Sequence, residues 1–152
     1  MTMNYDDEMS FASGLSAFEA KHFSRAMQLL SPLAEAGEAE AQYRVAIMLQ
    51  NGLGCVRNEA LALDWMRRAA EQGHAPAQHG VGFMYLEGEG VDKDPATAAH
   101  WFRLAAEQGL AGSQTTLAMM YEQGNGVEKD PEFFAKARTR LAEMGADVAD
   151  AH

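Results

Sequence analysis

Hydrophobic residues recur along this chain at the spacing of one helix face. In the stretch at 75–88, Ala77, Val81, Met84 and Tyr85 follow the i, i+4, i+7, i+8 pattern of an amphipathic helix. After a glycine-containing loop, a second stretch carries small and aromatic residues on its inner side. These are Ala98, Trp101, Phe102, Ala105 and Ala106. The pattern predicts two helices joined by a loop.

The helix pair is repeated along the chain at a fixed period. The endings LAEAG, AAEQG, AAEQG and LAEMG close on Gly37, Gly73, Gly109 and Gly145, each 36 positions after the last. A period in this range predicts an all-α stack of helical units that share a continuous core. The predicted units are 10–37, 38–73, 74–109 and 110–145.

The second helix of each inner unit carries one tryptophan among alanines. One period before Trp101 lies Trp65, with alanines at the flanking equivalent positions. Small residues let helix backbones approach closely, and a large aromatic side chain fills the remaining space. We therefore interpret Trp65 and Trp101 as core residues rather than as ligand-stacking ones.

The loop between the helices has its own signature. Gly88 and Gly90 are suited to positive φ, which lets the chain leave the first helix and turn back. Asp94 is the predicted N-cap of the second helix, and Pro95 its first residue. Asp130 and Pro131 repeat this arrangement, and Asn58 followed by Glu59 is a variant of it.

The two ends depart from the pattern. The first unit has only FEAKHFSR between Ala17 and Ala26, so we expect a shorter turn there without a glycine loop. Residues 1–9 are expected to be an N-terminal segment outside the repeats, and residues 146–152 a frayed tail.

A family resemblance is carried by two segments, GVGFMYLEGEGVDKDPATAAHWFRLAAEQG (80–109) and TLAMMYEQGNGVEKDPEFFAKARTRLAEMG (116–145). With their paired glycines, following valine, Asp-Pro and AAEQG-type ending, they resemble the Sel-one-like repeat (SLR), a longer-looped relative of the tetratricopeptide repeat. The resemblance covers about 38–145 well and 10–37 loosely. It implies a right-handed α/α superhelix and a role as an adaptor or scaffold for protein complexes. The family has no shared catalytic residues to transfer.

Composition narrows the classes of partner. The formal net charge of −10 argues against nucleic-acid binding, which needs clustered Lys and Arg, and favours a neutral or basic partner or simple solubility. No apolar run is long enough to cross a membrane, and the first ten residues lack the pattern of a signal peptide. The single cysteine excludes an internal disulfide. We therefore expect a cytoplasmic protein.

Motifs for catalysis, metal binding or cofactor binding are not found in the sequence. His74 and His79 are five residues apart, which does not match the i, i+4 spacing of a two-histidine metal site. The loop GEGVDKD lacks the alternating oxygen ligands of an EF-hand. Cys55 replaces the valine of other units and is interpreted as a small apolar residue, with a reactive thiol as the alternative. We expect no enzyme activity, cofactor or metal.

A candidate binding face follows from the resemblance. If the first helix of each unit lines the concave wall, as in related repeats, its inward but non-core positions can be assigned by register. They are Leu15 and Phe18; Tyr43, Ile47 and Gln50; His79, Phe83 and Leu86; and Thr115, Met119 and Glu122. The row Leu15, Ile47, Phe83 and Met119 predicts an apolar stripe that is either exposed for binding or covered by the neighbouring helices.

Two classes of function remain open at this point. The first is an adaptor that binds a peptide or protein segment on the concave face, with acidic surroundings that favour Lys or Arg on the partner. The second is a structural repeat protein that forms a homo-oligomer and binds its partners through loops or the outer face. An enzyme or sensor built on Cys55 or a histidine is the least supported interpretation.

Overall fold

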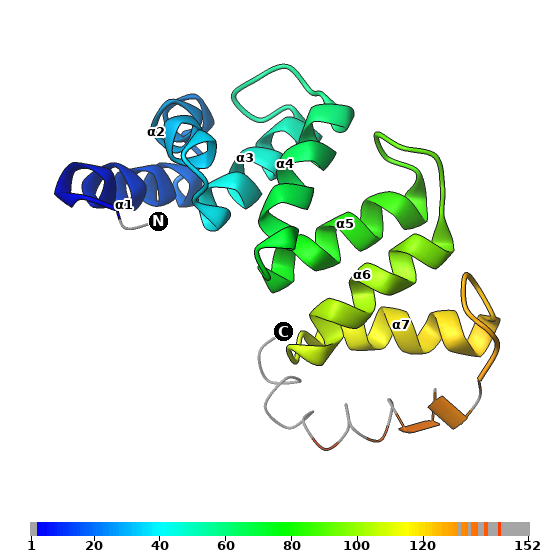
Figure 1. Ribbon diagram of the computed structural model, residues 1–152. Helices are drawn as coiled ribbons and strands as arrows, with labels where there is room; N and C mark the ends of the chain where they lie inside the picture. The colour runs from blue at the N-terminus through cyan, green and yellow to red at the C-terminus, as the bar shows by residue number, and fades with distance from the viewer. Residues whose placement is uncertain (1–2, 131, 134, 137–138, 140–142, 144–152) are drawn as a thin grey trace.

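The computed structural model describes residues 3–130 together with 132, 133, 135, 136, 139 and 143. Within these residues the chain forms helices and no strands (Figure 1). The helices are α1 (Tyr5–Glu19), α2 (Phe23–Glu35), α3 (Ala39–Asn51), α4 (Glu59–Glu71), α5 (Ala75–Glu87), α6 (Pro95–Glu107) and α7 (Ala111–Gln123). The expected tail at 146–152 lies outside the described residues. Helix α1 begins at Tyr5 because Asn4 caps it, so part of the expected segment 1–9 is helical.

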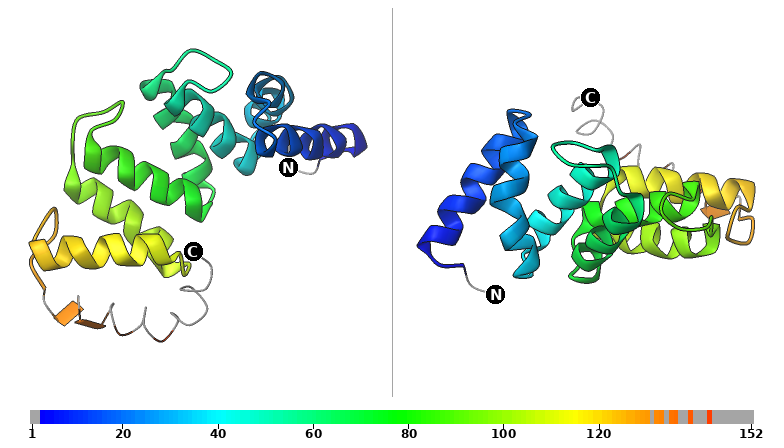
Figure 2. Two further views of the ribbon diagram at one scale, coloured as in Figure 1. Left: turned by 180° about the vertical axis from the view of Figure 1, so that it is seen from behind. Right: turned by 90° about the horizontal axis from the view of Figure 1, so that it is seen from above.

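Each helix packs mainly on the helices just before and just after it in the chain. The stack bends, with the glycine loops after α3, α5 and α7 along the outer edge of the bend and the short turns before α5 and α7 along the inner edge (Figures 1 and 2). Contacts between sequence neighbours are what a repeat architecture requires, because no unit buries its apolar face alone. The predicted all-α repeat solenoid is therefore confirmed.

Close helix packing rests on large side chains set against small ones. Phe102, Met66, Met84, Met48 and Leu30 are fully or almost fully buried. A Cβ added to Gly82 would lie only 2.9 Å from the ring of Phe102, so the absence of a side chain lets α5 approach α6. The core interpretation of the tryptophans needs revision. Trp65 and Trp101 are partly exposed at the margin of the core, and their neighbours Met66 and Phe102 occupy its centre.

The loops confirm the predicted caps. The carboxylate of Asp94 accepts hydrogen bonds from the backbone nitrogen of Thr97 at 3.1 Å and from its hydroxyl at 2.6 Å. Asn58 caps α4 in the same way, through the backbone nitrogen of Leu61 at 3.0 Å. These side chains satisfy backbone donors that the first turn leaves unpaired.

Each second loop glycine lies against the preceding unit. Gly90 has φ +71°, and a Cβ there would be 2.5 Å from the carbonyl oxygen of Glu59, the first residue of α4. Gly54 and Gly126 lie in the same manner against the first residues of α2 and α6. A Cβ on Gly54 would be 2.5 Å from the carbonyl carbon of Phe23, and one on Gly126 would be 2.5 Å from the carbonyl oxygen of Pro95. The glycine therefore permits direct contact between the backbones of successive units, besides the positive φ that the sequence predicted.

Glutamine side chains also join neighbouring units, and we call these contacts the glutamine bridges. Gln108 donates from its amide nitrogen to the carbonyl oxygen of Gly73 at 2.9 Å and to the side-chain oxygen of Gln78 at 2.8 Å. One period earlier, Gln72 donates to Gly37 and Gln42 at 3.0 and 2.9 Å. The glutamine of the AAEQG ending thus has a structural role that sequence reasoning missed.

Candidate functional site

The residues predicted for the concave face lie on the first helix of each unit, α1, α3, α5 and α7. We call this set the helix-A wall. Phe83 on α5 is 41% exposed and Met119 on α7 is 47% exposed, which places both among the exposed large hydrophobic residues of the described chain. They occupy equivalent positions 36 residues apart, on consecutive first helices of the stack.

The other members of the apolar row are more covered. Ile47 and Phe18 are half-buried and pack against the core, and Leu15 is half-buried. The ring of Phe18 meets that of Phe23 edge-on, with centroids 5.6 Å apart, while the guanidinium of Arg44 lies 4.7 Å from its centroid. The structure therefore distinguishes an exposed part of the row on α5 and α7 from a covered part on α1 and α3.

Phe83 opens onto a shallow pocket. Its lining comes from α3, α5 and the two loops that follow them, namely Gln50, Asn51, Arg57, Phe83 and Glu89. The amide nitrogen of Gln50 donates to the Glu89 carboxylate at 2.7 Å, which ties the end of α3 to the loop after α5. Sequence reasoning assigned Gln50 and Phe83 to one face but could not place Glu89 beside them, because no spacing rule connects residues 39 positions apart.

The aromatic flank of the helix-A wall is engaged within the protein. His79 bonds through Nδ1 to the Ser113 hydroxyl at 2.7 Å, and its ring centroid lies 5.2 Å from that of Phe102. Burial lowers the pKa of His79, so the imidazole is neutral at pH 7. Tyr43 packs on the ring of His74 with centroids 4.8 Å apart. Both side chains therefore join consecutive first helices as well as bordering the wall.

The remaining predicted residues differ in their exposure. Leu86 is half-buried and packs against the core around Phe102. Thr115 is exposed, and its hydroxyl donates to the carbonyl oxygen of Ala111 at 3.1 Å. Glu122 is exposed near the end of α7. Of these three, Glu122 alone adds a charge to the wall, and it is negative.

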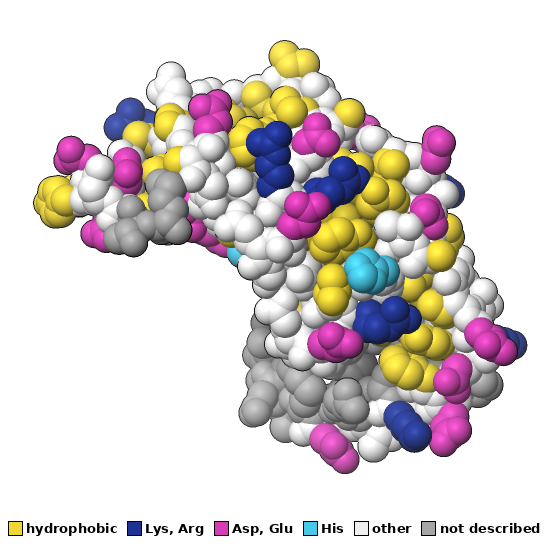
Figure 3. Space-filling model, in the orientation of Figure 1, with side chains coloured by type: hydrophobic (Ala, Val, Ile, Leu, Met, Phe, Trp, Pro, Cys, Tyr) yellow, Lys and Arg dark blue, Asp and Glu magenta, His cyan; other side chains and the backbone are white. Residues whose placement is uncertain are grey.

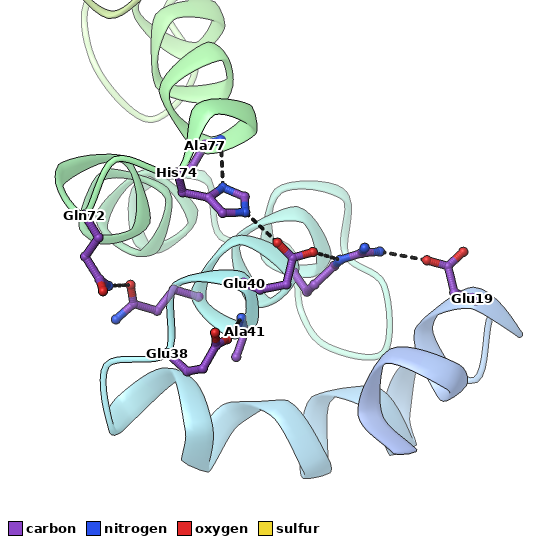
Figure 4. Close-up of polar contacts among 9 residues, drawn as sticks. Glu19, Glu38, Glu40, Ala41, Gln72, His74 and Ala77 are labelled. Carbon is purple, nitrogen blue, oxygen red and sulfur yellow. Dashed lines mark hydrogen bonds and ion pairs between the residues drawn. The ribbon is translucent and has the colours of Figure 1, made fainter. Parts of the chain in front are cut away.

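A chain of polar contacts runs across the first helices at the N-terminal end of the wall (Figure 4). Glu19 pairs with Arg44 at 3.0 Å, Arg44 pairs with Glu40 at 2.9 Å, and Glu40 meets Nε2 of His74 at 2.5 Å. Nδ1 of His74 accepts from the backbone nitrogen of Ala77 and so caps α5. The hydrogen bond from His74 is the main cause of a lowered Glu40 pKa. This chain links α1, α3 and α5.

The second helices present a different surface (Figure 3). There, hydrophobic side chains are interspersed with charged ones over α4 and α6. The guanidinium of Arg68 covers the ring of Trp65 at 4.6 Å, and Arg67 and Arg103 donate to the hydroxyls of Tyr85 and Tyr121 at 2.6 and 2.9 Å. Arginine thus covers part of the aromatic surface on this side.

Cys55 is half-buried in the loop after α3, where its thiol lies 3.5 Å from the carbonyl oxygen of Met48. Burial raises the pKa of this thiol, which disfavours the reactive thiolate. Among the described residues, no three His, Cys, Asp or Glu side chains lie together as metal ligands. Within the same residues, no helix combines the length and the apolar character needed to cross a membrane.

Helix pairs in register, each contacting its neighbours through loop glycines and glutamine bridges, define the class of α/α repeat solenoids. The Sel1 repeat family model matches residues 39–74, 75–110 and 111–133, and the chain belongs to this family. Sel1 repeat proteins generally act as scaffolds for protein–protein interaction.

Two solved structures illustrate the similarity. One is a protective antigen of uropathogenic Escherichia coli strains that displays an SLR fold, with a TM-score of 0.87 and 31% identity over 91% of this chain. The other is a Sel1 repeat protein from Oxalobacter formigenes, with a TM-score of 0.83 and 31% identity over 88% of this chain. This chain spans 31% and 55% of their respective lengths. No curated protein matches it.

Proposed function

We propose that this protein is an adaptor that binds an apolar protein segment with basic flanks on the α5–α7 part of the helix-A wall. The observation that carries the proposal is the paired exposure of Phe83 and Met119 at equivalent positions of consecutive units. Exposed apolar side chains that recur along one face form the kind of stripe that marks an interaction surface. A bound segment would cover both side chains with its own apolar anchors.

The charges around this stripe favour a basic partner. Glu89 lines the pocket beside Phe83, and Glu87 and Glu122 are exposed at the ends of α5 and α7. Arg57 is the basic residue of the pocket, and its guanidinium is paired with Glu59 at 2.7 Å. Lys or Arg beside the apolar anchors of the partner would therefore meet complementary charge, which raises association rates and specificity.

Selection of peptides from a random library tests the proposal even though the natural partner is unidentified. We expect enriched peptides with two apolar anchors flanked by Lys or Arg. Fluorescence anisotropy should show that the double variant Phe83→Asp/Met119→Asp loses at least about tenfold in affinity, which corresponds to about 1.4 kcal/mol. Far-UV circular dichroism confirms that the helices are retained.

Leu61→Asp provides a matched control. Leu61 is also 41% exposed, but it lies on α4, a second helix. Its substitution should leave peptide affinity unchanged. Equal loss in both variants, or no loss in the double variant, would refute binding on the helix-A wall and favour a site on the loops or second helices.

A further inference from the structure

Helix α1 leaves one of its faces open at the start of the stack. Tyr5 is 73% exposed and Met9 is 53% exposed, and both lie on α1 one turn apart. Further along the same helix, Ala12, Ser13 and Ser16 are also exposed. We call these five residues the open α1 face.

Comparison with α5 shows what kind of surface this is. Gly14 and Gly82 have equivalent roles, since each lies against the second helix of its own unit, at Leu30 and Phe102. By this register Ala12 corresponds to Gly80, where an added Cβ would lie 2.8 Å from the sulfur of Met66 on the preceding helix α4. The same register pairs Met9, Ser13 and Ser16 with Ala77, Val81 and Met84, which are all fully buried. The open α1 face thus occupies positions that inner helices bury in the stack.

The open α1 face is complementary to itself. Its large residues, Tyr5 and Met9, lie in the first half of the helix, and its small residues, Ala12 and Ser16, lie in the second half. In an antiparallel pair related by a two-fold axis, Met9 of each copy meets Ala12 of the other, and Tyr5 meets Ser16. Large side chains of each copy then pack against small ones of the other on both sides of the axis, as an isologous interface requires.

Charge supports the same orientation. The first turn of α1 carries Asp6, Asp7 and Glu8, whereas Lys21 and Arg25 are exposed just beyond its other end. In the register with Met9 over Ala12, the acidic turn of one copy lies over residues 13–15 of the other, in the half of the helix nearer its basic end. A parallel pair would instead place the two acidic turns together, in a chain whose net charge is already −10.

We propose that the open α1 face binds a second copy of this chain, giving a two-fold dimer through an antiparallel α1–α1 pair. A single helix pair is smaller than the standard interface of about 1,600 Å², so the dimer should be weak and its population should depend on concentration. The proposal is independent of peptide binding on the helix-A wall, which uses α5 and α7.

Sedimentation velocity on the full chain, from micromolar to about millimolar concentration, measures the association directly. We expect a monomer–dimer equilibrium whose dissociation constant rises at least tenfold in Met9→Asp and, separately, in Ala12→Lys. Each variant buries an unpaired charge in its own homodimer. Leu61→Asp, with comparable exposure elsewhere, should leave the equilibrium unchanged.

Mixing the two variants tests the register. In the mixed dimer Asp at position 9 of one copy faces Lys at position 12 of the other. The symmetric contact, between Ala12 of the first copy and Met9 of the second, is unchanged. We therefore expect an affinity within about threefold of the wild type. Circular dichroism checks folding, and Tyr5→Glu replaces either variant if its helicity is lost. A monomer at every concentration, assembly beyond a dimer, dimers insensitive to both variants, or failure of the mixture to restore pairing would each overturn the proposal.

Discussion

Replacing Gln108 by methionine would test whether the glutamine bridges stabilise the junction between units. The side chain of Gln108 is the donor in two contacts to the preceding unit, to Gly73 and to Gln78. Methionine has a similar length, and the sequence itself carries methionine at the equivalent position 144. The substitution therefore removes the amide with little change in volume.

The expected loss follows from the burial of the acceptor. Gln78 is 5% exposed, so water cannot readily replace the lost donor at its side-chain oxygen. A buried acceptor left unpaired costs about 1–3 kcal/mol. The carbonyl oxygen of Gly73 adds little, because Gly73 lies in an exposed turn where water can reach it. We expect Gln108→Met to lower the free energy of unfolding by about 1–3 kcal/mol.

A double-mutant cycle isolates the bridge itself. Gln78→Met removes the acceptor together with its own donation to the carbonyl oxygen of Ala70 at 3.3 Å. In the double variant neither side-chain amide of the bridge remains to be left unpaired. Its loss of unfolding free energy should therefore be smaller than the sum of the two single losses by about 0.5–3 kcal/mol. Urea unfolding followed by circular dichroism gives these differences from the transition midpoints at constant slope.

Gln28→Met is the control, because Gln28 is exposed on α2 and makes no bridge, so its substitution should change stability by no more than about 0.5 kcal/mol. A loss in Gln108→Met no larger than in this control would refute a stabilising role for the bridge. Strict additivity in the cycle would show that the two glutamines contribute separately and that their contact carries no net energy.

Three further predictions concern the core, the loops and pH. Phe102→Ala should lower stability by about 3–5 kcal/mol, and Trp101→Ala by less, because only Phe102 is fully buried; equal losses in urea unfolding would contradict this. Gly109→Ala should lower the free energy of unfolding by about 1–2 kcal/mol, because the only obstacle to a side chain there is the positive φ. Gly90→Ala should lower it by about 1–3 kcal/mol more in the same assay, because its Cβ would also clash with the backbone of the preceding unit. Because burial lowers the pKa of His79 below 6.5, the unfolded chain binds the proton more readily. The contribution of His79 to the free energy of unfolding should therefore be fully present above pH 6.5 and be lost as pH falls through the folded-state pKa. His79→Gln should flatten the dependence of stability on pH in this range.

Local features of the fold could be predicted because they have local causes. The 36-residue period, the cap at Asp94 and the positive φ of Gly88 and Gly90 depend on residues close in sequence. The relative depth of Trp101 and Phe102 could not be predicted in the same way. Both lie on the apolar side of α6, and the open space beside Gly82 decides which ring is central.

The candidate site was predicted less completely, for a similar reason. Helical register predicted Phe83 and Met119 at equivalent positions of one wall, where both side chains are exposed, but it could not show that Arg44 covers Phe18 or that Glu89 meets Gln50. Those contacts join different units and depend on how the units are set against one another. The glutamine bridges are of the same kind, and the repeated glutamine in the two AAEQG endings was the available signal.

Each second loop glycine contacts the first residue of the second helix of the preceding unit. This contact has a consequence for how the number of units in such a chain can change. Gly54, Gly90 and Gly126 meet backbone atoms, so this one contact between units does not depend on which side chains surround it. Excision or duplication of one 36-residue block, such as 74–109, would re-form the same glycine-to-backbone contact at the new junction. A unit gained or lost by recombination would keep this contact, and adaptation would be confined to the side chains at the junction, such as Met66 and the residue that takes the place of Gly80.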